Sequence, residues 1–158
     1  MERNKIVANR LQELFINGRW IANTNYKEIL LSIDWQQALA KIQNLNTIAS
    51  LTYHINYYLA GLLNAFETGQ LNISDKYSFD LPTITSEEDW KALINKLFKN
   101  AEMFIAKVLR MDDQILDRIF IDPKYGTYSR NIEGVIEHSY YHLGQVSLIK
   151  KLIMQGQN

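Results

Sequence analysis

The chain has 158 residues, of which 47% are hydrophobic and 22% are charged, as expected for one globular domain covering residues 1–158. Basic and acidic residues balance at 17 each, so no net charge attracts nucleic acid or an anionic membrane, and neither is an expected partner. The absence of cysteine excludes disulfides, thiolate zinc sites and cysteine nucleophiles.

The first predicted helix covers residues 2–16 and ends at Gly18. Its apolar face consists of Val7, Leu11, Leu14 and Phe15. The segment is charged and lacks the apolar run of a secretion signal, and no stretch of the chain reaches the ~18 apolar residues of a membrane span. Together with the absence of cysteine, this favours a soluble protein of the cytoplasm.

Residues 19–45 are predicted to form a connector with short helical pieces. Asn25 with Glu28, and Asp34 with Gln37, have the spacing of an N-cap and its partner three residues later. The apolar residues of the connector are Leu30, Leu31, Ile33 and Trp35. We therefore expect the connector to be packed against the rest of the domain.

The second predicted helix runs from about Asn46 to Thr68 and ends at Gly69. Its apolar stripe consists of Leu51, Ile55, Tyr58, Leu62 and Phe66. A polar loop over residues 70–85 follows, and Thr85 to Glu88 match the capping box that opens a helix. The third helix therefore begins here, and its clear helical periodicity continues to about Arg110.

A short helical turn is predicted near residues 113–120. The tyrosine-rich segment DPKYGTYSR follows, in which Pro123 and Gly126 interrupt regular structure. The fourth helix then runs from about Ser129 to about Met154. No segment has the period-two pattern of a strand, so the sequence predicts an all-α four-helix bundle. Its long connections, residues 17–45 and 69–85, leave room for crossovers between distant helices.

All three histidines of the chain fall on apolar helix faces. In the fourth helix, His138 and His142 are one turn apart within GVIEHSYYHLGQV. The same inward stripe also contains Ile132, Val135, Val146 and Ile149. His54 lies on the apolar stripe of the second helix, three residues after Leu51.

A buried imidazole without partners costs about 1–3 kcal/mol, so three of them in one core require compensation. An H-x-x-x-H pair alone is a weak signal, because most such pairs are hydrogen-bonded or partly exposed. A chelating pair with a third core histidine fits a divalent metal, with a position left open for water or substrate, as well as it fits hydrogen-bonded histidines. Neutral imidazole binds zinc, nickel, iron and copper. We expect zinc or nickel first and iron as a further candidate.

The segments that carry these histidines, TIASLTYHINYYLAGLL and IEGVIEHSYYHLGQVSLIKKLI, resemble the DinB/YfiT-like superfamily of bacterial four-helix-bundle proteins. The segment GRWIANTNYKEILLSIDWQQALAKI resembles a subgroup of it, so the resemblance covers nearly the whole chain. It implies a DinB-like up-down-down-up bundle and a metal held by His54, His138 and His142. Relatives often pair through helix faces, and we expect a homodimer.

The resemblance leaves the reaction open, because some relatives are thiol-dependent S-transferases or isomerases, others have been described as metal-dependent hydrolases, and many have no assigned activity. A three-histidine metal can lower the pKa of bound water or hold a thiol as thiolate. We therefore expect a metal-dependent enzyme acting on a small-molecule substrate, with a low-molecular-weight thiol as the candidate cosubstrate. The alternatives are a non-enzymatic metal-stabilised bundle that binds a small molecule or a partner protein, and a metal-free dimer with hydrogen-bonded histidines.

Two further residues are candidates for substrate binding, whereas no catalytic residue can be assigned. Tyr58 is one turn from His54, although a role in the core is the simpler interpretation. Arg130, at the start of the fourth helix, could receive an anionic group, although this stretch could also be an ordinary turn and cap. Glu137 projects about 100° away from His138 and is expected to be a solvated charge.

Overall fold

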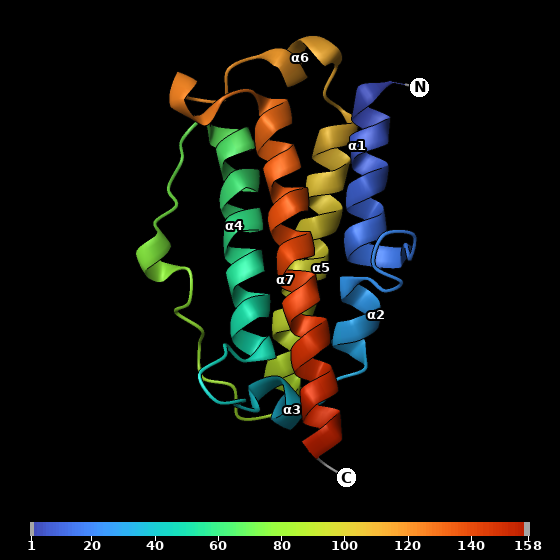
Figure 1. Cartoon of the computed structure of the whole chain (residues 1–158). Coiled ribbons are helices and arrows are strands. Elements are labelled where there is room, and N and C mark those ends of the chain that lie inside the picture. Colours follow the sequence, from blue (N-terminus) through green and yellow to red (C-terminus); the bar gives the residue numbers. More distant parts are fainter. Residues whose placement is uncertain (1, 157–158) are drawn as a thin grey trace.

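The computed structural model describes residues 2–156, and their helices pack side by side into an elongated bundle (Figure 1). The long helices are α1 (Arg3–Gln12), α4 (Ile48–Thr68), α5 (Glu87–Leu109) and α7 (Tyr128–Gly156). A π-helical turn, η1 (Glu13–Asn17), extends α1. Residues 2–156 contain no strand, and only an isolated bridge joins Ile119 to Thr127. The prediction of an all-α helical domain is therefore confirmed for this part of the chain.

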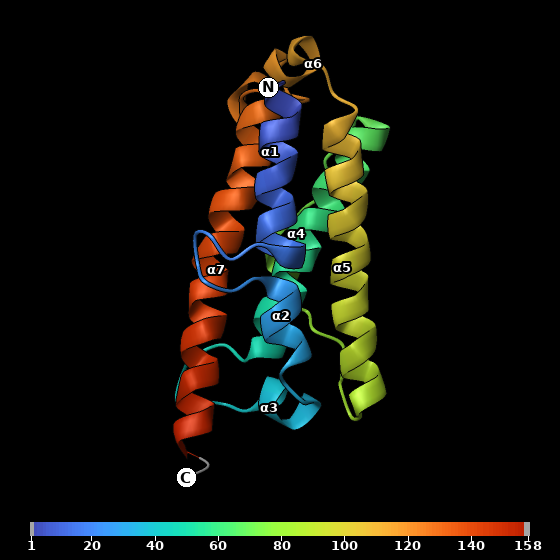
Figure 2. The ribbon, with the colours of Figure 1, turned by 90° about the vertical axis from the view of Figure 1, so that its right-hand side faces the viewer.

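Two short helices lie in the predicted connector over residues 19–45, and a third lies at the helical turn predicted near residues 113–120. They are α2 (Tyr26–Leu31), α3 (Trp35–Leu39) and α6 (Asp113–Asp117), with 3₁₀ turns η2 (Asp75–Tyr77) and η3 (Pro123–Tyr125). Helices α1, α2 and α3 follow one another down one side of the bundle (Figure 2). The first three helices thereby cover the length that a single long helix covers elsewhere.

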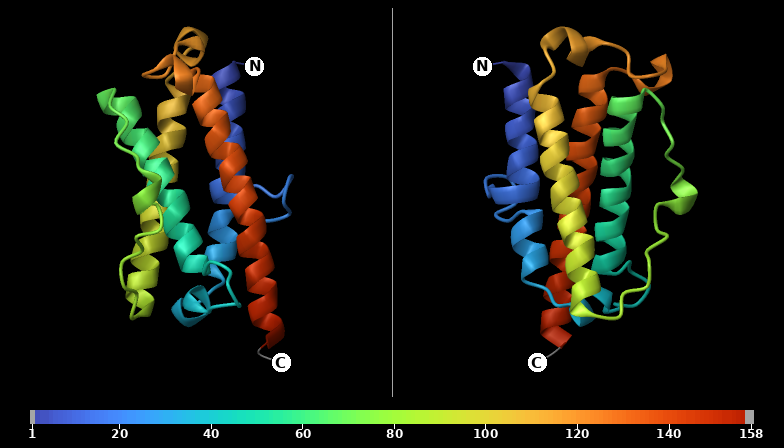
Figure 3. Two further views of the ribbon diagram at one scale, coloured as in Figure 1. Left: turned by 60° about the vertical axis from the view of Figure 1, so that its left-hand side comes forward. Right: turned by 180° about the vertical axis from the view of Figure 1, so that it is seen from behind.

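Helices α1 and α7 run in one direction along the bundle, and α4 and α5 run in the other (Figures 1 and 3). Because α4 and α5 point the same way, the chain between them must return along the whole bundle. Residues 69–86 do so on the outside of α4, and we call this segment the strap (Figure 3). Helix α4 packs against both α5 and α7, and its contact with α7 positions the candidate site.

Side-chain caps explain where several helices begin. The side chain of Asn25 accepts a hydrogen bond from the backbone of Glu28, and Asp34 forms a capping box with Gln37, as predicted. The predicted capping box at Thr85 is wrong by one residue. The N-cap of α5 is Ser86, whose hydroxyl accepts from the Asp89 backbone.

Two helix ends illustrate different uses of glycine. Gly69 closes α4 in the left-handed conformation at φ 71°, as its position after Thr68 predicts. Gly18 has an extended backbone instead, and a Cβ there would lie 1.9 Å from Cγ of Glu13. Glycine is therefore required at position 18 because the backbone there lies against Glu13 of the π-helical turn, and not because it adopts a left-handed conformation.

The core runs the length of the bundle between the long helices and includes the buried side chains of Leu11, Phe15, Leu51, Trp90, Phe104 and Val146. The connector contributes Tyr26, Leu30 and Ile33, so it is packed down as predicted, except that Leu31 is 60% exposed. None of the helices in residues 2–156 has the length and apolar character needed to cross a membrane.

Candidate metal centre

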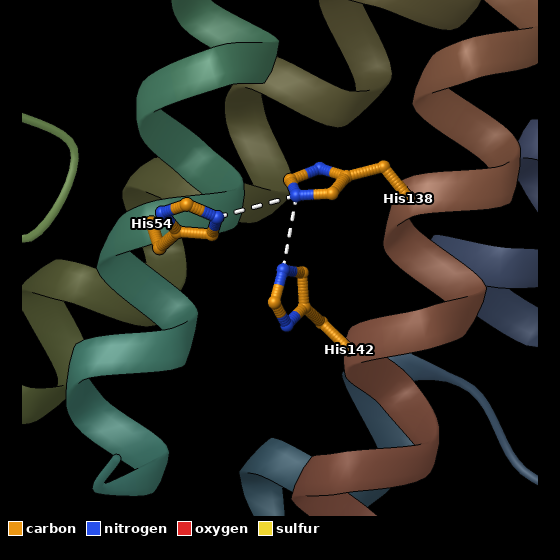
Figure 4. Close-up of side chains that lie close together, drawn as sticks. All are labelled: His54, His138 and His142. Carbon is orange, nitrogen blue, oxygen red and sulfur yellow. Dashed lines mark hydrogen bonds between the residues drawn. The ribbon is translucent and has the colours of Figure 1, made fainter. Parts of the chain in front are cut away.

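His54 on α4 and the pair His138 and His142 on α7 point toward one another across the gap between these two helices (Figure 4). The Nε2 atom of His138 lies 3.2 Å from Nε2 of His54 and 2.9 Å from Nε2 of His142. One ring nitrogen from each residue falls within 4.8 Å of the other two. The structure therefore brings together all three residues that the sequence singled out as metal ligands.

Helical periodicity produces this convergence. The spacing of four residues places His138 and His142 on one face of α7, in line with the buried Val135 and Val146. On α4, His54 is flanked by the buried Leu51 and Ile55, so its ring also points inward. Side chains of His54 and His142 are almost fully buried, whereas His138 is half-buried and faces an opening.

Two of the three rings are oriented by oxygen atoms on the side away from the cluster. The Nδ1 atom of His54 lies 3.3 Å from the backbone carbonyl oxygen of Ser78 in the strap. The Nδ1 atom of His142 lies 2.6 Å from the side-chain oxygen of Gln145. Both oxygens can only accept hydrogen bonds, so each Nδ1 must carry the proton. In a neutral ring the Nε2 atom then presents a lone pair.

All three rings favour the neutral form. Burial, and to a lesser extent the neighbouring His142, lowers the pKa of His54. Burial also lowers the pKa of His142. Burial, followed by the two neighbouring histidines, lowers the pKa of His138 to about 4. At neutral pH each ring therefore has one N–H and one lone pair.

The proton count shows why the cluster fits a cation. His54 and His142 use their protons on Ser78 and Gln145, and both direct a lone pair at Nε2 of His138. A single proton on that nitrogen can satisfy only one of them, which leaves the other lone pair without a partner. A divalent ion accepts one lone pair from each of the three rings, and the other ring nitrogen of a metal-ligating histidine usually donates its proton to an oxygen acceptor. The donor set thus fits a three-histidine metal site.

Aromatic side chains surround the three histidines. The ring of Phe79, from the strap, stacks on His54 with centroids 4.1 Å apart and planes inclined by 13°. The ring of Tyr58 meets His54 and His138 edge-on, at 5.0 Å and 5.3 Å between centroids. These contacts restrict the rotation of the histidine rings and shield one side of the cluster from water.

An open pocket of about 450 Å³ adjoins the cluster on the side of His138. Its lining comprises Tyr58, Leu62, Tyr125, Arg130, Asn131, Gly134, Val135 and His138. Both predicted substrate-binding residues, Tyr58 and Arg130, therefore lie in the same pocket as a candidate ligand. The hydroxyl of Tyr58 donates to Asp75 at 2.5 Å, and Arg130 pairs with the exposed Glu137 at 2.9 Å.

Several residues of the site were not predicted from the sequence. Gln145 follows His142 by three residues on the same helix, a spacing that could have identified it. Ser78 and Phe79 come from the strap, and only the return path of the chain beside α4 brings them to His54. Gly134 also lines the pocket, and the sequence gives no signal for it because glycine carries no functional group.

The chain matches no protein-family model, no curated protein and no solved structure.

Proposed function

We propose that this chain binds a divalent metal through His54, His138 and His142 and is a metal-dependent enzyme of the DinB/YfiT-like superfamily. The observation that carries this proposal is the convergence of three Nε2 atoms, two of them with their Nδ1 protons already committed to oxygen acceptors. The opposed directions of α1 and α7 relative to α4 and α5 support the up-down-down-up order expected of that superfamily. Zinc and nickel are the preferred ions, followed by iron.

The pocket beside His138 supports an enzyme over a metal that serves stability alone. A purely structural site is closed by its protein ligands, whereas a catalytic site leaves a position for another molecule. Among residues 2–156, three candidate ligands gather here, and the half-buried His138 faces a pocket large enough for a small substrate. A divalent ion in this position would act as a Lewis acid that lowers the pKa of water or of a thiol.

The reaction is either thiol-dependent S-transfer or hydrolysis. The chain has no cysteine, so a thiol nucleophile must come from a soluble cosubstrate. Ser78 and Gln145 would orient the rings of His54 and His142 toward the metal, and Phe79 would shield His54 from water. The adjoining pocket would hold the substrate. Both reactions would use the same site, with a thiol as the nucleophile in one and water in the other.

Metal analysis of protein purified without an affinity tag tests the site itself. We expect close to one equivalent of zinc, nickel or iron per chain, and loss of this metal in His54→Ala and His142→Ala. Tyr141→Ala is a matched control, because this side chain is next to His142 in sequence, packs on its ring at 4.9 Å and is 64% exposed. Folded histidine variants that retain the full metal content would contradict the proposal.

Activity is tested separately with the metal-loaded protein. Conjugation of an electrophile is measured with several low-molecular-weight thiols, and hydrolysis is measured with ester and amide substrates in the absence of thiol. We expect one of these activities, and its loss when all three histidines are replaced by alanine. Activity that persists in the triple variant would rule out the metal mechanism, whereas bound metal without any activity would favour the non-enzymatic alternative.

A further inference from the structure

The pocket beside His138 combines an apolar wall with a single positive charge. The side chains of Leu62 and Val135 and the rings of Tyr58 and Tyr125 form the apolar wall. Arg130 is the only arginine or lysine among the eight lining residues, and none of the eight is a carboxylate. A pocket with this lining favours a molecule that is mostly apolar and carries one negative charge.

Arg130 is placed to reach a ligand that also lies near the histidines. Its guanidinium bonds to Glu137, seven residues later, at 2.9 Å. Seven residues correspond to about 10 Å along a helix, so the side chain of Arg130 extends along α7 toward the turn that carries His138. Both partners of this ion pair are exposed, and exposed pairs are weak. A ligand carboxylate can therefore replace Glu137 and form a bidentate contact with the guanidinium.

Gly134 determines how much room the pocket has. It lies within α7, one turn before His138, and lines the pocket. A Cβ at this position would meet no atom within 4 Å, so neither close packing nor a left-handed backbone requires glycine here. Glycine inside a helix is unfavourable relative to alanine. What the missing side chain does provide is open space between Arg130 and His138.

We propose that this pocket binds a small carboxylate with an apolar, ring-sized body, with the carboxylate on Arg130 and the ring beside Gly134. An apolar cavity of ~150 Å³ accommodates benzene, so a pocket of about 450 Å³ has room for a ring and its substituents. The end of the ligand opposite the carboxylate points toward His138. The identification of this molecule as the substrate rests on the proposed function, whereas its binding does not.

The test uses phenylacetate and its neutral analogue phenylacetamide as probes. Each is titrated into the full-length, isotope-labelled protein after removal of metal, and the backbone amide signals are followed by NMR. We expect phenylacetate to bind at least about tenfold more tightly than phenylacetamide, with millimolar affinity typical of a fragment of this size. The largest shifts are expected at Gly134 and Val135. Working without metal excludes direct coordination of the carboxylate, and repeating the titration with zinc shows whether the preference persists in the loaded protein.

Four variants assign the binding to the proposed contacts. In Arg130→Gln, phenylacetate and phenylacetamide should bind with about equal affinity. Glu137→Gln should strengthen binding of phenylacetate severalfold, because Arg130 is released from its ion pair. Gly134→Leu should abolish binding of both probes by filling the pocket. Gly144→Leu is its matched control, because Gly144 is also in α7 with no atom near its would-be Cβ but lies outside the pocket lining. Circular dichroism checks that each variant is folded.

Equal affinity for the acid and the amide, or an acid preference that survives Arg130→Gln, would overturn the proposal. So would shifts that cluster away from Gly134, or the absence of binding. These outcomes are independent of the metal analysis: loss of the metal site leaves acid binding to the metal-free protein unchanged, and failure of acid binding leaves the metal content unchanged.

Discussion

The side-chain oxygen of Gln145 lies 2.6 Å from Nδ1 of His142, on the side of the ring that faces away from the other histidines. The contact fixes the proton on Nδ1 and directs Nε2 toward His138. Because the two residues are three apart on one helix, the orientation is built into α7 and does not depend on the packing of other segments. His54 has no such local partner and is oriented from the strap.

Replacement of Gln145 should weaken metal binding without removing it. Loss of an outer partner of a ligating histidine typically costs 10–100-fold in affinity, and we expect a loss of about this size in Gln145→Leu. In Gln145→Glu a carboxylate accepts the same bond, so affinity should be retained or raised. Competition with a chromophoric chelator measures both. Identical affinities in the Leu and Glu variants would show that the acceptor has no role.

The metal-free protein should lose stability as the pH falls from about 6.5 toward 4. Burial lowers the pKa of His138 to about 4 in the folded chain, against 6.5 for the free side chain. Between these values the unfolded chain binds more protons than the folded one, so acid favours unfolding. The slope is up to about 1.4 kcal/mol per pH unit for each histidine that differs in this way.

Urea unfolding at a series of pH values measures this slope. His138→Gln removes the titrating group and should flatten the curve between pH ~5 and ~6.5, above the range in which most carboxylates titrate. An unchanged slope in this variant would mean that His138 is not responsible. Bound metal should shift the loss of stability to lower pH until protons displace the ion.

Removal of metal should lower the stability of the wild-type chain. An ion that binds only the folded state stabilises it by about 4 kcal/mol when its free concentration is a thousand times its Kd. Thermal unfolding with and without chelator measures the difference, which corresponds to a decrease of roughly 10 °C for a domain of this size. His54→Ala should unfold at the same temperature under both conditions. A wild-type melting temperature unaffected by chelator would argue against a bound ion.

Tyr26 should contribute to the position of α7. Its side chain is fully buried and its hydroxyl donates at 2.6 Å to the backbone oxygen of Ser139, between His138 and His142 in sequence. Burial raises the pKa of Tyr26 well above its usual value, so the group stays neutral. Tyr26→Phe should cost about 1 kcal/mol in the free energy of unfolding.

Chemical denaturation of the metal-free protein measures the effect of Tyr26→Phe. The metal content should remain at the wild-type level, because the ring still fills its place in the core. Thr68→Ala serves as a control in which a hydroxyl that bonds a helix carbonyl is lost at an exposed position. If Tyr26→Phe were no more destabilising than this control, the bond to α7 would be of little importance.

Features that depend on helical periodicity could be predicted from the sequence. The spacing of His138 and His142, and the place of His54 on an apolar stripe, suffice to predict that the three rings face the interior. The caps at Asn25 and Asp34 are local interactions between neighbours in sequence, so they were predicted correctly as well. At Thr85 two adjacent hydroxyl residues compete for the cap, and the sequence pattern alone does not distinguish them from each other.

Features that depend on the path of the chain could not be predicted. Phe79 and Ser78 belong to a polar, proline-containing segment that has no helical periodicity, and nothing local indicates that it passes over His54. Likewise, Leu31 was expected to be buried because it is apolar, but α2 has only one buried face and Leu31 lies on the other. The pocket also requires the relative placement of α4, α7 and η3, which periodicity does not specify.

The separation of His54 and His138 along the chain means that an ion bound between them would also act as a cross-link. The two residues are 84 positions apart, so an ion shared between them would close a loop containing all of α5. A covalent link across a loop of this length restricts the unfolded ensemble by an amount worth about 4–5 kcal/mol. A chain without cysteine would thereby possess a reversible counterpart of a disulfide, and its resistance to unfolding would follow the supply of metal in its surroundings rather than the redox potential.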